Sequence, residues 1–113
     1  MHELGLMQNI VEIVEDYFRK NNVKKVLTVI LEIGRLSGVV PTALEFCFDV
    51  CIKGTLLQGA KLEIQQINSL GLCKMCRKEF DLLENKFSCP ICKKEDWEII
   101  SGKEIIIKGL EVV

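Results

Sequence analysis

The stretch CKMCRKEFDLLENKFSCPIC, residues 73–92, begins and ends with two cysteines separated by two residues. A two-residue spacer lets both thiolates of a pair reach one metal ion, and the intervening hairpin brings the second pair to the first. This spacing is typical of a closed tetrahedral zinc site, which stabilises folding and leaves no open position for catalysis. We therefore predict a structural zinc ion bound by four thiolates. They belong to Cys73, Cys76, Cys89 and Cys92.

Two alternatives remain for these cysteines, an iron(Cys)4 electron-transfer centre and a pair of disulfides. Four thiolates suit iron as well as zinc, whereas disulfides are rare in a reducing compartment. Residues 70–98 carry six basic and six acidic side chains, and Trp97 is their one aromatic side chain that we expect to be exposed. Because this segment has no net charge to attract phosphate, no nucleic acid partner is predicted.

Two helices are predicted from the spacing of apolar residues. Over residues 4–18, apolar side chains recur every three or four positions, which is typical of an amphipathic helix. A shorter helix has Pro41 in its first turn and stops at Gly54, and its apolar face includes Cys47 and Cys51. Free cysteine is among the most buried residue types, so we interpret this pair as core residues; a redox pair or a soft-metal site is the alternative.

Three segments rich in β-branched residues predict strands, at 23–36, 60–67 and 103–113. In the first of them, Leu27, Val29, Leu31 and Ile33 alternate with a mixed second face. The chain order is therefore helix, strand, helix, strand, cysteine segment, strand. This order predicts an α+β fold, with two helices packed on a three-stranded sheet and an inserted four-cysteine zinc ribbon module.

The cysteine segment, residues 70–99, has little apolar periodicity and too few hydrophobic residues for a core of its own. We predict that it is a separate zinc-binding domain. Residues 1–69, completed by a strand within 100–113, are predicted to form the larger α/β domain.

Charge and hydropathy exclude several classes of protein. Lysine and arginine together number 15, against 16 aspartates and glutamates, so neither nucleic acid nor an anionic membrane is an expected partner. No apolar run approaches the ~20 residues of a membrane-spanning helix. Glu3 lies where a signal peptide would carry basic residues, and we expect a cytoplasmic protein.

The only histidine is His2, beside the amino group of the chain. The α-amino nitrogen of Met1 and the amide and Nδ1 nitrogens of His2 can close short chelate rings around one ion, and the amide of Glu3 can close another. Displacing amide protons requires a strongly polarising ion that favours planar nitrogen ligands, which selects nickel(II) or copper(II) over zinc. We predict a nickel site here, so residues 1–69 are the nickel-binding domain. An exposed histidine without a role is the alternative.

Over its whole length the chain resembles the HypA-type metallochaperones, which help to insert nickel into NiFe hydrogenases. The matching segments are the opening MHE, EIGRLSGVVP at 32–41, the two C-x-x-C pairs and GKEIIIKGLEV at 102–112. The resemblance implies a nickel site at His2 with main-chain nitrogens of Met1 and Glu3, and a structural zinc at the four cysteines. It also implies a GTPase of the HypB type as partner, and delivery to the hydrogenase large-subunit precursor.

We therefore predict a nickel metallochaperone that carries Ni(II) transiently and Zn(II) structurally, as a monomer or weak homodimer. It is not predicted to be an enzyme, because no nucleophile with its base, phosphate loop or catalytic metal spacing is present. Two rival functions are a zinc-ribbon protein-interaction module and a small rubredoxin-like redox protein. Uptake of nickel by a colourless protein that already holds one zinc would exclude both rivals.

Overall fold

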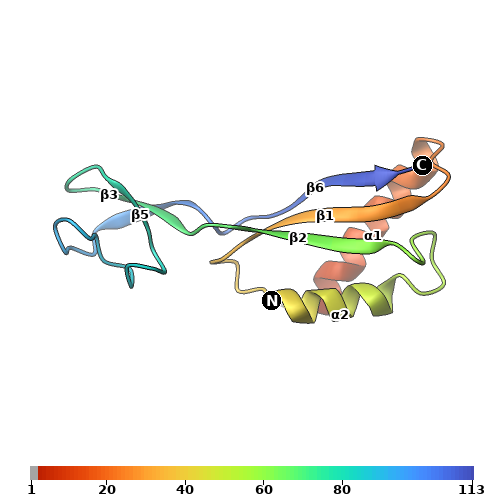
Figure 1. Ribbon diagram of the computed structural model, residues 1–113, viewed down its shortest axis with the longest axis horizontal. Coiled ribbons are helices and arrows are strands. Elements are labelled where there is room, and N and C mark those ends of the chain that lie inside the picture. Colours follow the sequence, from red (N-terminus) through yellow and green to blue (C-terminus); the bar gives the residue numbers. More distant parts are fainter. Residues whose placement is uncertain (1–2) are drawn as a thin grey trace. The chain divides into compact units, whose positions relative to one another are not determined.

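The computed structural model describes residues 3–113, which form two helices and six strands (Figure 1). The helices are α1 (Glu3–Lys20) and α2 (Pro41–Cys51). The strands are β1 (Val26–Gly34), β2 (Lys61–Ile67), β3 (Leu70–Cys73), β4 (Glu79–Asp81), β5 (Trp97–Ser101) and β6 (Ile105–Val112). They form two three-stranded sheets, in the orders β2-β1-β6 and β4-β3-β5. Neither helix has the length and apolarity that crossing a membrane requires, as far as the described residues go.

The chain divides into two compact units. The first comprises Met1–Glu32, Gly38–Gln65 and Ile106–Val113, and the second comprises Ile33–Ser37 and Gln66–Ile105. Both helices belong to the first unit, and the sheet β4-β3-β5 belongs to the second. The second unit thus contains all of residues 70–99 together with short flanking segments.

Helix α1 is amphipathic, as its apolar spacing predicts. Its buried side chains are Met7, Ile10, Val11 and Val14. The same spacing assigns Leu4 and Tyr17 to the apolar stripe, but they are 48% and 45% exposed. The buried stripe is shorter than predicted because only the middle turns of the helix face the core.

Strand β1 has one buried face, on which Val29, Leu31 and Ile33 alternate as predicted. Leu27, assigned to the same face, is wrongly predicted, since it is 41% exposed and Val26 is buried instead. Helix α2 adds the fully buried Leu44 and Phe48 to the core. The chain contains two helices and the three-stranded sheet β2-β1-β6, and a four-cysteine module is inserted before the last strand, which confirms the α+β fold.

In the second unit, β3 pairs antiparallel with both neighbours. Leu70 lies opposite Ser101 of β5, and Cys73 lies opposite Trp97. The buried cluster of this unit contains only Cys73, Phe80, Leu82 and Cys89, with further half-buried side chains around it. Two of these four residues are cysteines, so burial alone gives the unit very little hydrophobic stabilisation.

Two glycines lie in close contact where the second unit begins and ends. A Cβ atom on Gly34 would collide with the carbonyl group of Gly102, and Gly102 itself has a φ of +108°. The backbone around them is tightly hydrogen-bonded, since Gly34 N–H donates to Glu104 (2.8 Å) and Leu36 N–H donates to Gly102 (2.7 Å). Only glycine allows this close approach of two chain segments.

Candidate metal centre

The four predicted zinc ligands meet in the second unit. Their Sγ atoms all lie within 4.8 Å of one another, and the Cys73–Cys92 and Cys76–Cys89 pairs are each 3.5 Å apart. Four thiolates at about 2.3 Å around one tetrahedral zinc ion lie about 3.8 Å from one another. The cluster is therefore suited to a metal ion of this size. Within residues 3–113, no other set of three or more histidine, cysteine or acidic side chains is gathered in this way.

The two C-x-x-C segments, which we call the first knuckle (residues 73–78) and the second knuckle (residues 89–94), share one backbone structure. In each, the first cysteine donates its N–H to the carbonyl five residues on and accepts from the N–H four residues on, at 2.9–3.0 Å. The residue after the second cysteine, Arg77 or Lys93, has a φ of 62° or 63°. The sequence repeat is therefore a structural repeat as well.

Backbone N–H groups of each knuckle point at the sulfur of its first cysteine. Those of Cys76 and Met75 lower the pKa of Cys73 below its ordinary value. Those of Cys92 and Ile91 lower the pKa of Cys89 to about 6. Such donors favour the thiolate, which is the form that binds a metal.

The second cysteine of each knuckle behaves in the opposite way. The N–H of Lys78 favours the Cys76 thiolate, but burial and the neighbouring Cys89 and Cys73 outweigh it and raise the pKa of Cys76 to about 11. The pKa of Cys92 is raised for the same reasons, against the N–H of Lys94. Four thiolates in such close contact require a cation among them.

Trp97 is not the exposed aromatic side chain that the sequence suggested. It is half-buried, its Nε1–H donates to the carbonyl of Phe87 at 2.7 Å, and the two rings lie 5.7 Å apart. This contact holds the segment just before the second knuckle against β5. It also removes the one side chain of the module on which a nucleic acid base could have stacked.

Met1 and His2, two of the predicted nickel ligands, lie outside the described residues. Glu3, the third, begins α1, and its carboxylate accepts a long hydrogen bond of 3.5 Å from the N–H of Val40. The predicted nickel contact of Glu3 uses its main-chain nitrogen, so this side-chain contact is separate from it. The nickel site at these three residues stays a prediction.

Cys47 and Cys51 lie one turn apart on α2 and are half-buried. Burial, and to a lesser degree the nearby Cys47, raises the pKa of Cys51 above its ordinary value. A thiol with a raised pKa is a poor nucleophile and a poor ligand near neutral pH. The two cysteines thus fit the interpretation as packing residues better than that of a redox pair.

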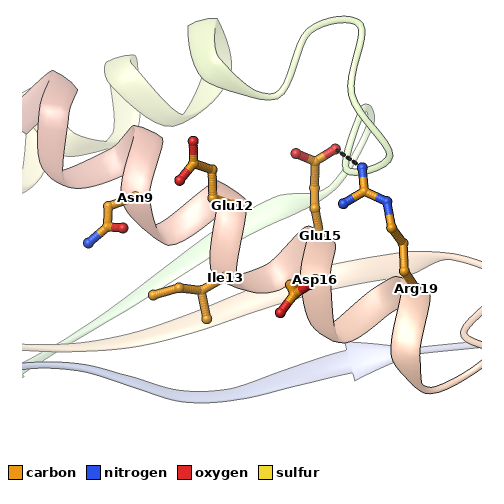
Figure 2. A pocket seen from close by; sticks show the side chains of 6 residues that line it. All are labelled: Asn9, Glu12, Ile13, Glu15, Asp16 and Arg19. Carbon is orange, nitrogen blue, oxygen red and sulfur yellow. Dashed lines mark ion pairs between the residues drawn. The ribbon is translucent and has the colours of Figure 1, made fainter.

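The outer face of α1 carries a hollow of about 370 Å³ with an acidic lining (Figure 2). Figure 2 shows Glu12 and Glu15 pointing to the same side of the helix, with Glu15 paired to Arg19 at 3.9 Å. All of these side chains come from one helix. They do not converge on a point as the four cysteines do, so the hollow is not a metal centre.

Residues 1–112 match the family model described as "Hydrogenase/urease nickel incorporation, metallochaperone, hypA". A hydrogenase maturation factor HypA from Trichodesmium erythraeum is 47% identical over 112 residues, covering 99% of this chain and 96% of the relative. A factor of the same name from Geobacter metallireducens is 45% identical and covers 99% of each chain.

Two solved structures share the fold. One is a solution structure of the Ni metallochaperone HypA from Helicobacter pylori, with a TM-score of 0.71 at 23% identity over all of this chain and 98% of the other. The other, a solution structure of a HypA protein, has a TM-score of 0.73 at 24% identity over all of this chain and 97% of the other. The match to the family model spans nearly every residue, including both cysteine pairs, and the chain belongs to the HypA family of nickel metallochaperones for hydrogenase maturation.

Proposed function

We propose that this chain binds Ni(II) at its N-terminus and delivers it for the maturation of NiFe hydrogenase, with a structural Zn(II) at Cys73, Cys76, Cys89 and Cys92. The observation that carries the proposal is the family match over residues 1–112, which includes the opening MHE segment. Nickel is the cargo of such a protein and zinc is its resident ion. No catalytic step is assigned to the chain.

The zinc assignment is supported by the geometry and surroundings of the four sulfur atoms. Their spacing suits a tetrahedral ion, and N–H groups of both knuckles are directed at them. The buried cluster of the second unit is small, so the unit needs a cross-link. A zinc ion, when bound, supplies that cross-link and a positive charge that keeps all four thiols deprotonated.

The nickel assignment is supported by the chemistry of the terminal residues. Met1 and His2 offer an amine, an amide and an imidazole nitrogen in succession, and Glu3 offers a further amide. Because each amide must lose its proton, the site favours nickel(II) over zinc(II). A terminal site also permits transfer to a partner. We propose a HypB-type GTPase and the hydrogenase large-subunit precursor as partners of this chain, which acts in the cytoplasm as a monomer or weak homodimer.

Metal analysis of protein with an untagged N-terminus tests both assignments. We expect one zinc per chain as purified, and uptake of one further nickel ion on titration. His2→Ala, or a Gly-Ser pair added before Met1, should abolish nickel uptake and leave zinc unchanged. Gln8→Ala is the matched control, because Gln8 is an exposed residue of α1 that offers no ligand to the terminus. Equal nickel titration curves for the wild type and all three variants would exclude the proposed N-terminal nickel site. Stoichiometric iron in the purified protein would exclude the proposed zinc site.

The delivery role is tested in cells that lack the gene for this chain. They should accumulate nickel-free hydrogenase precursor, and excess nickel in the medium should partly restore hydrogenase activity, because a delivery factor raises the local supply of nickel. The wild-type gene should restore maturation and the His2→Ala gene should not. Normal maturation without the gene would favour the interaction-module or redox function instead.

A further inference from the structure

Two large apolar side chains are exposed beside the four-cysteine cluster. Met75 is 56% exposed and Ile91 is 62% exposed. They occupy the same position in their knuckles, since each directly precedes the second cysteine. Single exposed apolar residues are common on protein surfaces, but here the exposure is repeated at equivalent positions of two knuckles that meet at one site.

The folding of the module does not account for these side chains. The knuckles use the backbone N–H groups of Met75 and Ile91, which point at the sulfurs of Cys73 and Cys89. Neither side chain belongs to the buried cluster of the second unit or to the half-buried residues packed around it. A polar residue could supply the same N–H group at either position without exposing apolar surface to water.

The knuckles are also positively charged. Residues 73–78 and 89–94 carry five basic side chains and no acidic one, which exceeds the net charge of about −2 of four thiolates on a zinc(II) ion. The first of the five, Lys74, lies 3.9 Å from the carboxylate of Asp96. The other four are exposed and have no ion pair within the described residues. They are Arg77, Lys78, Lys93 and Lys94.

The basic residues repeat in the same way as the apolar ones. Arg77 corresponds to Lys93 and Lys78 to Lys94, so each knuckle presents one apolar side chain followed by two basic ones. Acidic residues follow each knuckle, at Glu79 and Glu95, which confines the positive surface to the knuckles themselves. We call the exposed side chains of Met75, Ile91 and the four unpaired basic residues the knuckle surface.

We propose that the knuckle surface is a docking site for an acidic segment of a partner protein that also carries apolar side chains. Charge complementarity supplies the attraction and orientation, and burial of Met75 and Ile91 supplies affinity. A nucleic acid fits less well, because Trp97 is occupied by Phe87 and no exposed aromatic side chain is left in the module for stacking. The proposal does not depend on nickel binding.

Four probes distinguish the possible occupants, each added to the ¹⁵N-labelled, zinc-loaded full chain. They are an amphipathic glutamate–leucine peptide, a lysine–leucine peptide of equal length, a single-stranded oligonucleotide and phosphatidylserine vesicles. We expect only the glutamate–leucine peptide to bind, with amide shifts confined to residues 74–78 and 91–94. Weaker binding at higher salt should accompany this, because the basic residues are exposed.

Variants test which side chains carry the binding. Met75→Ser combined with Ile91→Ser should weaken the peptide at least about tenfold, as expected for buried anchor residues of an interface. Lys78→Gln combined with Lys94→Gln should weaken it and reduce the salt dependence. Arg77 and Lys93 are left unchanged because their positive φ values make substitution there a backbone change. Ile100→Ser is the matched control, since Ile100 is 45% exposed in the same unit. One zinc per chain in every variant establishes that the knuckles are intact.

Three results would overturn the proposal. Equal affinity for the lysine–leucine peptide, or for the oligonucleotide or vesicles, would exclude an acidic protein segment as the preferred occupant. Undiminished binding by the Met75→Ser/Ile91→Ser variant would place the contact elsewhere. A concentration-dependent dimer that this variant dissociates would identify a second copy of the chain as the occupant.

Discussion

The place of a cysteine within its knuckle determines its acidity. The first cysteine receives two backbone N–H groups from the knuckle and has a lowered pKa, about 6 for Cys89. The second is affected more by burial and by its sulfur neighbours, and the pKa of Cys76 rises to about 11. The first cysteine of each knuckle is therefore the more acidic of the two, and Cys89 is largely a thiolate at neutral pH in the metal-free chain.

This difference predicts how zinc affinity changes with pH. Binding to the metal-free chain at pH 7–9 must remove protons from Cys76 and Cys92, because their raised pKa values keep them protonated. Raising the pH weakens the competition between protons and zinc for these two sulfur atoms. If two protons are released per zinc ion bound, the zinc affinity should increase about a hundredfold per pH unit. Competition titrations with a chelator of known pH dependence measure the slope. An affinity that does not vary over this range would contradict the assigned pKa directions.

At the scale of the elements, the helices and strands with a strong apolar periodicity could be predicted from the sequence. The short strands, which have no such periodicity, could not. Helices α1 and α2 and strands β1, β2 and β6 lie where apolar spacing and β-branched residues indicate. Strands β3, β4 and β5 have three to five residues each, too few to show an alternation, and the pairing of β3 with β5 shifts register between Leu70 and Gly71. The clustering of the four cysteines follows from their spacing alone. The difference between the pKa values of the first and second cysteines cannot be predicted from spacing, and neither can the exposure of Met75. Both depend on the folded structure of the knuckle.

The contact between Gly34 and Gly102 was also beyond prediction, because the sequence does not say which distant segments approach each other. Gly34→Ala places a Cβ against the Gly102 backbone, which cannot move without breaking its hydrogen bond to Leu36. We expect a loss of about 1–3 kcal/mol in the free energy of unfolding, typical of overpacking. Chemical denaturation of the zinc-loaded chain measures this.

Gly5→Ala is the control for that substitution. Gly5 lies in α1 with no atom within 4 Å of an added Cβ. Alanine is the better helix former, so this change should stabilise the protein by about 0.5–1 kcal/mol. If both substitutions had the same effect, the close contact at Gly34 would not be a determinant of stability.

At the scale of the whole molecule, we expect the two units to depend on metal to different degrees. Both helices and their buried residues belong to the first unit, which includes none of the four clustered cysteines. The second unit has a small buried cluster of which two cysteines are part. Loss of the metal should therefore unfold the second unit selectively.

Cys92→Ser tests this dependence. The helical circular dichroism signal should be largely kept, while the fluorescence of Trp97 shifts to the red because its contact with Phe87 is lost. Cys47→Ser is the control, since Cys47 lies on α2 in the first unit and its thiol is outside the cluster. Loss of the helical signal together with the Trp97 shift in Cys92→Ser would show that the two units unfold as one.

The two proposed metals should also leave the chain at different pH values. Nickel at Met1 and His2 competes with protons for an amine of pKa ~7.7–8.0 and an imidazole of pKa ~6.5, and for amides as well. The proposed zinc ion would be held by four thiolates, and its release is coupled to unfolding of the second unit. On acidification of a chain loaded with both, nickel should be released first, at about pH 6. Metal analysis of samples dialysed at each pH measures the release. Release of both metals at the same pH would contradict two separate sites.

The pairing of Leu70 with Ser101 also bears on how the chain reaches its folded state. The first unit needs β6 beside β1, yet the whole cysteine segment separates β6 from β2 along the chain. Closing a long loop costs entropy that grows with the logarithm of its length. Once β3 and β5 have paired, Leu70 and Ser101 lie opposite each other. The part of the loop between β2 and β6 that is still unpaired then consists of only a few residues on each side. Because the cysteine segment precedes β6 in the chain, the ribosome makes it first, and pairing of β3 with β5 can shorten this loop before β6 is made.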